Sequence, residues 1–182
     1  DMEQLVQLLG ETRRREAKLD VRRQGIPRLL QFVMTPEALA SESVDRAFLL
    51  PGGTGYIRVT GFEAETGRQI KAAIEKLGGA ALKALVLDLR DNSGGLLPPA
   101  LETAALFLPA GAKILTIRGR AAGGDEPTVP AGNEHYRFPL AVLINARTAS
   151  ASEIVAGALQ DYDRAVILGE PSYGKGLVQS IY

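Results

Sequence analysis

Three short apolar segments in the second half of the chain limit its fold more than any other feature. They are ALVLDL, LAVLIN and RAVILG, which begin at Ala84, Leu140 and Arg164. The first is a nearly continuous apolar run, which is typical of a strand buried on both faces of a sheet. Helical patterns alternate with these runs. Strands that alternate with helices predict a layered α/β core.

The helical patterns are defined by apolar residues that recur every three or four positions. One begins at Glu63 and ends at Gly78, a second begins at Pro98, and a third contains the segment TASASEI. Glycine after a helix and proline at its start are common end signals. The apolar faces of the first two are Ile70, Ala73, Ile74 and Leu77, and Leu101, Ala104, Ala105 and Leu108.

The remaining segments carry weaker signals. Residues 2–9 suit a short amphipathic helix, and residues 121–138 form a long polar loop of a kind that is often functional. Alternating or apolar residues predict further strands. These are AKLDVRR, RLLQFVMT, VDRAFLL, YIRVT, KILTIRG and LVQSIY.

Composition excludes several classes of function. At 182 residues we expect one principal domain, and Lys plus Arg and Asp plus Glu both count 21, so no net charge attracts nucleic acid or an anionic membrane. The absence of cysteine excludes thiolate catalysis, and a single histidine, His135, argues against a zinc site. Neither a P-loop nor a G-x-G-x-x-G motif is present. We expect no metal, no cofactor and no membrane-spanning segment.

Ser150 in TASASEI and Lys175 in SYGKG are the strongest candidates for catalysis. A serine hydroxyl becomes a nucleophile when a base removes its proton, and a lysine serves as that base if burial or a lack of anionic partners keeps it neutral. The glycines that flank the lysine allow a close approach of the backbone. Apolar neighbours are expected to exclude water from the lysine: Tyr173, Leu177 and Val178.

Each of these motifs also has a structural interpretation. Ser150 and Glu153 have the spacing of a capping box, and SYGKG suits a surface turn with an exposed lysine. Glu153 and Asp161 are expected to be helix-end and packing groups. His135 is expected to be a loop residue, and a Ser-His-Asp arrangement would depend on it entirely.

Candidate oxyanion donors and a candidate partner for the lysine lie in the same motifs. The amide of Ala151 is expected at the positive end of a helix, where it would donate to a developing oxyanion. Gly94 or Gly95, in RDNSGG after a buried strand, would supply a second amide, although a plain turn is the alternative. Gln179 follows Lys175 by four positions and would hydrogen-bond it without adding charge.

Four ordered segments resemble the carboxyl-terminal processing proteases, also called tail-specific proteases. They are YIRVTGF, LVLDLRDNSGGLL, LINARTASASEIVAGALQD and AVILGEPSYGKGLVQ, and they span about Gly55 to Gln179. The resemblance implies a serine endopeptidase with a Ser-Lys dyad. In it Ser150 is the nucleophile, Lys175 the general base and Gln179 the residue that orients the lysine.

The same resemblance assigns the oxyanion donors and a fold. Ala151 and one of Gly94 and Gly95 match the donors. The family core is related to the ClpP and crotonase architecture, in agreement with the α/β alternation. Residues 1–25 are expected to be a remnant of a PDZ domain, its last helix and strand, and residues 26–182 a protease core that is truncated at its carboxyl end.

The resemblance also implies a setting. Members of the family need no metal or cofactor and cleave protein substrates near apolar carboxyl termini. They act outside the cytoplasm, in the periplasm, at the cell envelope or in the thylakoid lumen. A peptide or protein substrate is therefore the expected partner, with an adaptor or a second copy of the chain as further candidates.

Two other classes of function use the same general fold. One is a non-catalytic ligand- or peptide-binding relative, against which the intact TASASEI and SYGKG motifs count. The other is an acyl-coenzyme A enzyme of the crotonase type, which requires an adenine site that the sequence does not reveal.

Overall fold

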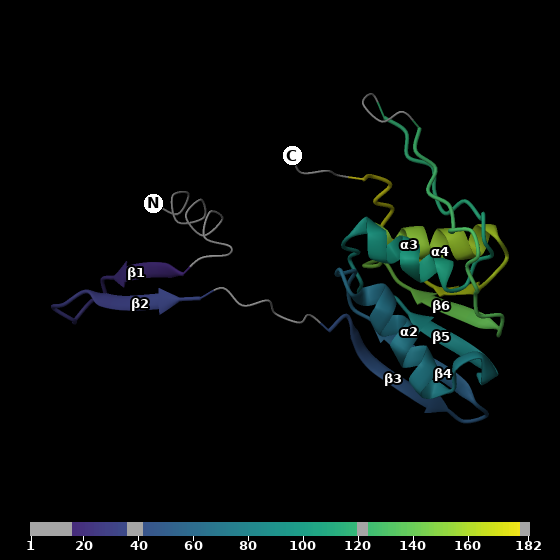
Figure 1. The fold of residues 1–182 in the computed structure, drawn as a ribbon, viewed down its shortest axis with the longest axis horizontal. Helices are drawn as coiled ribbons and strands as arrows, with labels where there is room; N and C mark the ends of the chain where they lie inside the picture. The colour runs from purple at the N-terminus through teal and green to yellow at the C-terminus, as the bar shows by residue number, and fades with distance from the viewer. Residues whose placement is uncertain (1–15, 36–41, 120–123, 179–182) are drawn as a thin grey trace. The chain divides into compact units, whose positions relative to one another are not determined.

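The computed structural model of the chain describes residues 16–35, 42–119 and 124–178. The chain divides into two compact units, Asp1–Ala40 and Ser41–Tyr182. Figure 1 shows the elements of each unit. The helix predicted for residues 2–9 lies outside the described residues.

The first unit contains an antiparallel pair of strands. They are β1 (Ala17–Val21) and β2 (Leu30–Met34), in the register that pairs Leu19 with Phe32. Both strands were predicted from the sequence. The proposed PDZ boundary lies between residues 25 and 26, whereas the two compact units divide between Ala40 and Ser41, because β1 pairs with β2 across residues 25 and 26. Whether residues 1–25 come from a PDZ domain stays a prediction.

The second unit is built on a sheet of five strands in chain order. The strands are β3 (Val44–Leu50), β4 (Thr54–Val59), β5 (Ala84–Asp88), β6 (Leu140–Ile144) and β7 (Val166–Gly169). β3 and β4 form an antiparallel hairpin, and the pairs from β4 to β7 are parallel. A parallel sheet connected by helices confirms the predicted α/β class.

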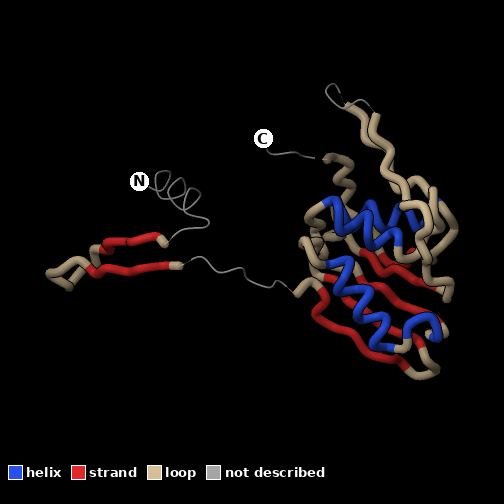
Figure 2. Tube along the Cα trace, in the orientation of Figure 1, coloured by secondary structure: helices blue, strands red, loops and turns tan. Residues whose placement is uncertain are grey.

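Three helices connect the parallel strands: α2 (Thr66–Leu77), α3 (Leu97–Ala105) and α4 (Ala151–Asp161). Each parallel strand lies on the same side of the strand before it in the chain. Right-handed crossovers between such strands place all the connecting helices on one face of the sheet. Figure 2 shows the helices in blue beside the red strands. The β4 residues Ile57 and Val59, on this face, are fully buried. A short 3-10 helix, η1 (Gly79–Ala81), leads from α2 to β5.

The core of this unit lies between the sheet and the helices. Ile70 and Ile74 of α2 and Leu159 of α4 are fully buried against strand residues such as Leu85 and Val142. The predicted apolar face of the first helix is confirmed, and its predicted end is the C-cap residue Gly78. The helix begins at Thr66 rather than at Glu63, because the Thr66 hydroxyl accepts the N–H of Glu63 at 2.8 Å.

The strand predicted for KILTIRG is wrong. Lys113 and Ile117 form only isolated bridges, to Thr128 and Asp125. Their partner segment contains Pro127, which has no N–H to donate, so a continuous ladder cannot form. The described part of LVQSIY, residues 177 and 178, has no strand, and the rest lies outside the described residues. No helix in residues 16–35, 42–119 and 124–178 has the length and apolarity to cross a membrane.

Candidate active site

Ser150 lies at the turn where β6 leads into α4. Its φ of 55° and ψ of −117° are rare for a residue with a side chain. Such a conformation costs on the order of 1–3 kcal/mol and persists where the surrounding structure enforces it. Here the buried hydroxyl of Thr148 donates to the Leu89 carbonyl at 2.8 Å and fixes the turn. A strained serine on a strand-to-helix turn is the local geometry of many nucleophilic serines.

Glu153 joins the serine helix to the loop that carries the lysine. Its Oε2 atom accepts the backbone N–H of Ser150 at 2.7 Å and that of Lys175 at 2.9 Å. Its Oε1 atom accepts the Ser172 hydroxyl at 2.7 Å and the N–H of Gly174 at 2.6 Å. One carboxylate therefore brings the backbones of both candidate residues together. The predicted capping box of Ser150 and Glu153 is present.

These hydrogen bonds also set the charge of Glu153. Burial raises the pKa of its carboxyl, but the bonds donated by Ser172 and by three backbone amides outweigh burial, so the pKa lies below its ordinary value of 4.5. The group is therefore an ionised acceptor at neutral pH. The sequence predicted a helix-end role and missed the link to the lysine loop. The S-x-x-E spacing was the one signal that pointed to this residue.

Lys175 is exposed, and so are the neighbours that were expected to exclude water from it. Tyr173 is 70% exposed, Leu177 69% and Val178 47%. The predicted shielding of the lysine is therefore not present in this structure. The proposed orienting residue, Gln179, lies outside the described residues.

A cleft of about 370 Å³ lies beside the two candidate residues. Ser150, Glu153 and Lys175 contribute its polar groups, together with Thr116. Its apolar side chains come from three separate segments of the chain: Leu115, Ile154, Leu177 and Val178. Most ligand sites combine an apolar lining with a few polar groups that fix orientation. The cleft has this composition.

The glycine loop after β5 lies directly against the serine turn. A Cβ atom placed on Gly94 would lie 2.8 Å from the Cβ of Ser150 and 2.9 Å from the amide nitrogen of Ala151. With its φ of 100°, this position requires glycine on both steric and conformational grounds. The two segments that were predicted to hold oxyanion donors are therefore adjacent.

The two predicted glycine donors differ in what their amides do. The N–H of Gly94 donates to Oδ1 of Asn92 at 2.9 Å. Gly95 forms a parallel bridge with Phe62, in which the flanking Gly94 carbonyl and Leu96 amide make the hydrogen bonds. The N–H of Gly95 therefore points away from Phe62. Like the N–H of Ala151, it has no acceptor among the residues that the structure describes.

Asn92 is a structural residue of the site that the sequence did not reveal. It is fully buried, and its Nδ2 donates to the Val59 carbonyl at 2.9 Å. Its own carbonyl accepts the N–H of Ala149 at 3.0 Å and the hydroxyl of Ser152 at 3.1 Å. Asn92 thus connects β4, the glycine loop and the serine turn. These partners are distant in sequence, so no local pattern indicated its role.

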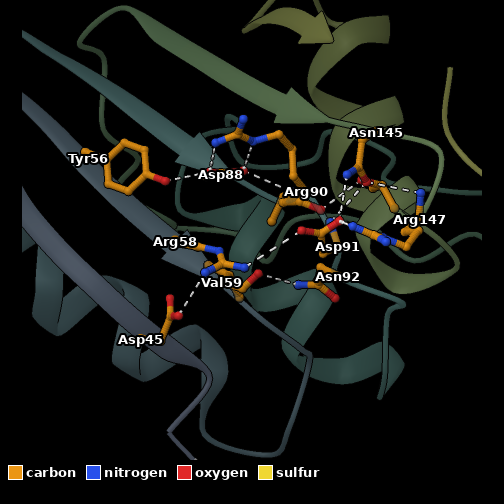
Figure 3. A network of polar contacts seen from close by, with 12 residues as sticks. Asp45, Tyr56, Arg58, Val59, Asp88, Arg90, Asp91, Asn92, Asn145 and Arg147 are labelled. Carbon is orange, nitrogen blue, oxygen red and sulfur yellow. Dashed lines mark hydrogen bonds and ion pairs between the residues drawn. The ribbon is translucent and has the colours of Figure 1, made fainter. Parts of the chain in front are cut away.

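A second polar group that the sequence did not reveal lies at the start of the glycine loop, as Figure 3 shows. Asp88, which is 1% exposed, accepts Nε and Nη2 of Arg90 at 2.9 and 2.7 Å and the Tyr56 hydroxyl at 2.5 Å. Burial raises the pKa of Asp88, and the bonds from Arg90 and Tyr56 lower it to a net value below the ordinary one. An ionised Asp88 therefore anchors the first residues after β5.

His135 and Asp161 are not part of this site. His135 lies in the loop before β6, as predicted, beside a different cavity lined by Glu134 and Arg137. Burial and the charges of Arg137 and Arg164 lower the pKa of His135. Asp161 is the last residue of α4. Within the described ranges, no group of three or more acidic or histidine side chains is arranged to hold a metal ion.

Comparison with known sequences gives a consistent family match. Residues 53–182 match Peptidase family S41. The carboxyl-terminal-processing peptidase 1, chloroplastic, of Arabidopsis thaliana is 41% identical over 148 residues, which are 81% of this chain and 30% of that protein. The carboxyl-terminal-processing protease of Synechocystis sp. is 41% identical over 133 residues, which are 72% of this chain and 31% of that protein. The chain thus spans about a third of the length of these curated relatives.

Solved structures give the same result for the fold. The photosystem II D1 C-terminal processing protease matches with a TM-score of 0.67 and 30% identity, over 92% of this chain and 46% of that one. A putative peptidase from Parabacteroides merdae has a TM-score of 0.62 at 17% identity, over 73% of this chain and 44% of that one, and so shares the fold alone. The resemblance to carboxyl-terminal processing proteases is confirmed.

Proposed function

Because the chain belongs to Peptidase family S41, we propose that it is the catalytic part of a serine endopeptidase that cleaves proteins near their carboxyl termini. Ser150 is the proposed nucleophile and Lys175 the proposed general base. One observation carries this proposal. A single oxygen of Glu153 accepts the backbone N–H of both residues, so they lie at one cleft.

The proposed reaction begins with neutral Lys175 taking the proton from Ser150 Oγ, which bonds to the carbonyl carbon of the scissile peptide. Lys175 then gives that proton to the leaving amine as the carbon–nitrogen bond breaks, and an acyl-enzyme remains. Lys175 then takes a proton from water, which attacks the ester carbon. It gives that proton to Ser150 Oγ as the ester carbon–oxygen bond breaks and the carboxylic acid product leaves. Gln179 is proposed to orient the lysine.

The oxyanion donors are proposed to be the amides of Ala151 and Gly95. The Ala151 N–H lies at the first turn of α4, where the helix dipole favours negative charge. Gly95 is favoured over Gly94 because the Gly94 N–H already donates to Asn92. Gly95 is also the exposed member of the pair.

The exposure of Lys175 adds a requirement to this proposal. A lysine acts as a base only in its neutral form. Contact with water stabilises the charged form, so covering the lysine favours the neutral one. We therefore propose that bound substrate covers Lys175 and completes the site, as closing elements do in many enzymes. The apolar lining of the cleft supports a substrate with apolar side chains near its carboxyl terminus.

Membership of the family also supports proposals about the architecture of the whole protein, its cellular location and its partners. We propose a ClpP/crotonase type of layering for the whole core and a PDZ remnant in residues 1–25. The named relatives include chloroplastic and bacterial proteins, which supports action outside the cytoplasm or in the thylakoid lumen. The proposed partners are protein substrates, with an adaptor or a second copy of the chain as further candidates.

The test is cleavage of an unstructured protein with an apolar carboxyl terminus by the chain and by two variants. Ser150→Ala and Lys175→Ala should each abolish turnover, whereas Lys71→Ala, which removes an exposed lysine of α2, should leave it unchanged. Turnover retained by either dyad variant rejects the assignment.

A second candidate function is peptide binding without catalysis, which the exposed Lys175 favours. It predicts that the unaltered chain binds an apolar carboxyl-terminal peptide without cleaving it, and that Ser150→Ala binds with the same affinity. Fluorescence anisotropy with a labelled peptide, followed by mass spectrometry of the peptide, separates the two functions.

A further inference from the structure

Two loops meet at the candidate site, and reciprocal hydrogen bonds between Asp91 and Asn145 join them close to where they leave their strands. The loops follow β5 and β6, which are parallel neighbours, so both leave the same edge of the sheet. The N–H of Asp91 donates to Oδ1 of Asn145 at 3.0 Å, and Nδ2 of Asn145 donates to Oδ1 of Asp91 at 2.7 Å. Figure 3 shows the two side chains facing each other.

Arg147 completes this connection. Its Nε donates to Oδ1 of Asp91 at 2.8 Å, and its Nη2 lies 2.6 Å from the same oxygen. Its backbone N–H donates to Oδ1 of Asn145 at 3.1 Å. Asp91 has a φ of 64°, a conformation that aspartate and asparagine tolerate better than most residues. We name Asp91, Asn145 and Arg147 the loop clasp.

The clasp lies immediately before the groups that are proposed to act on substrate. Asp91 precedes Asn92, whose carbonyl accepts the N–H of Ala149 at 3.0 Å. Beyond it, Gly94 packs against Ser150 and the amide of Ala151. The relative position of the two loops therefore sets the relative position of the proposed oxyanion donors and the nucleophile.

The energetics of the clasp indicate a role in positioning more than in stability. The Asp91 and Arg147 side chains are 39% and 77% exposed, and exposed ion pairs contribute little to the free energy of unfolding. Catalysis is more sensitive to geometry than stability is, because a displacement of about 1 Å can lower a rate by about 10²-fold. An exposed clasp can thus be dispensable for folding and important for turnover.

We propose that Asp91, Asn145 and Arg147 are positioning residues that hold the glycine loop against Ser150 in the geometry needed for oxyanion stabilisation. The proposal rests on the proposed function of Ser150. It assigns the clasp no contact with substrate and no proton transfer. It predicts an effect on kcat with little effect on KM.

The activity test uses Asn145→Ala and Asp91→Asn in the full chain. Asn145→Ala removes both reciprocal hydrogen bonds and should lower kcat by about 10- to 100-fold with KM within about twofold. Asp91→Asn keeps the tolerance of positive φ and an acceptor for Asn145, so it should retain more activity than Asp91→Ala. The double variant Asp91→Ala/Asn145→Ala should cost no more than the larger single effect, because the two side chains act as one unit.

Asp45→Ala is the matched control. Asp45 lies on β3 and pairs with Arg58 at 3.2 Å, and Arg58 also lies 3.9 Å from Oδ2 of Asp91. Asp45→Ala therefore removes a neighbouring ion pair and leaves every hydrogen bond of the clasp in place. Its kcat should equal that of the unaltered chain. Circular dichroism at the assay temperature establishes that each variant is folded. If the clasp residues only stabilised the fold, each variant would lose activity in proportion to the fraction of its molecules that is unfolded.

Amide hydrogen exchange provides a second readout that needs no turnover. Asn145→Ala should speed exchange at Ala149 and Gly94, whose N–H groups bond to Asn92, while core amides of β5 remain protected. Unchanged exchange at these two amides, or an unchanged kcat in Asn145→Ala, overturns the proposal. If Ser150→Ala retains turnover, the proposed function fails instead, and the exchange result still decides the clasp.

Discussion

Glu153 is the residue on which the geometry of the candidate site depends most. It accepts hydrogen bonds from Ser150, Ser172, Gly174 and Lys175, and so holds the lysine loop against the serine helix. No other side chain in the described ranges bonds to both candidate residues. Two consequences follow, one for stability and one for activity.

The first prediction concerns Glu153→Gln. The folded-state pKa of Glu153 lies below its ordinary 4.5, so the stability that its charge contributes is fully present above pH 4.5 and is lost as pH falls through the lower folded value. Glu153→Gln should therefore be less stable than the unaltered chain at neutral pH, and the difference should shrink in acid. Urea titrations between pH 3 and pH 7 measure it.

The same variant should lower kcat by about 10²-fold, because the lysine loop loses its charged anchor. Glu170→Gln is the control, since Glu170 is exposed near the same loop and its side chain makes no hydrogen bond with any described residue. Equal effects of the two substitutions, or a difference in stability that grows in acid, would show that Glu153 does not have this role.

At the scale of elements, α4 serves as a platform for the serine turn. Val155 and Leu159 are fully buried between this helix and the sheet, and α3 packs beside it. Ala151 and Ser152, the first two residues of the helix, are buried as well, so packing holds the strained turn at Ser150 in place. Packing of α4 is thus a condition for the geometry of the site.

The prediction at this scale compares two leucines. Leu159→Ala, in the core, should lower the free energy of unfolding by about 2–5 kcal/mol through lost burial and a residual cavity. Leu168→Ala, on β7 and 48% exposed, should lower it by less than about 1 kcal/mol. Urea unfolding of the two variants gives both values, and similar losses would contradict the burial of α4 against the sheet.

Most elements were predictable from the sequence because their signals are local. ALVLDL and LAVLIN form strands since their apolar runs are continuous, and Gly78 ends its helix as expected. KILTIRG has the alternating pattern of a strand, but the segment beside it cannot form a continuous ladder with it, so the predicted strand is wrong. Strand formation depends on the neighbouring segment, which the sequence of one segment does not specify.

The candidate site was only partly predictable for the same reason. Ser150, Lys175 and the glycine pair lie in recognisable motifs, and the structure brings Ser150 beside Gly94. The roles of Asn92 and Glu153 depend on contacts with loops that are remote in sequence. The exposure of Lys175 also depends on which segments fold over it, and apolar neighbours in the sequence do not determine that.

At the scale of the whole molecule, the core belongs to one unit. The buried hydrophobic cluster runs from Ile57 to Leu159, within Ser41–Tyr182. In the described part of the first unit, Ala17 is the one buried hydrophobic residue. The second unit therefore contains the apolar burial that drives its folding.

It follows that a chain of residues 41–182 should unfold cooperatively with a thermal midpoint within about 4 °C of the full chain, a shift of roughly 1 kcal/mol at this size. Differential scanning calorimetry measures the midpoint. Leu159→Ala placed in the shorter chain should cause the same loss as in the full chain. A non-cooperative transition of residues 41–182 would contradict an independent core.

The central claim is that Lys175 activates Ser150, and covalent labelling tests it most directly. The chain and its Lys175→Ala variant are treated with a peptidyl phosphonate that carries apolar side chains, so that the probe itself covers Lys175 as substrate is proposed to do. The modified residue is located by tandem mass spectrometry. The account predicts phosphonylation of Ser150 in the unaltered chain and its loss in Lys175→Ala. An unlabelled Ser150, or equal labelling in the variant, would contradict it.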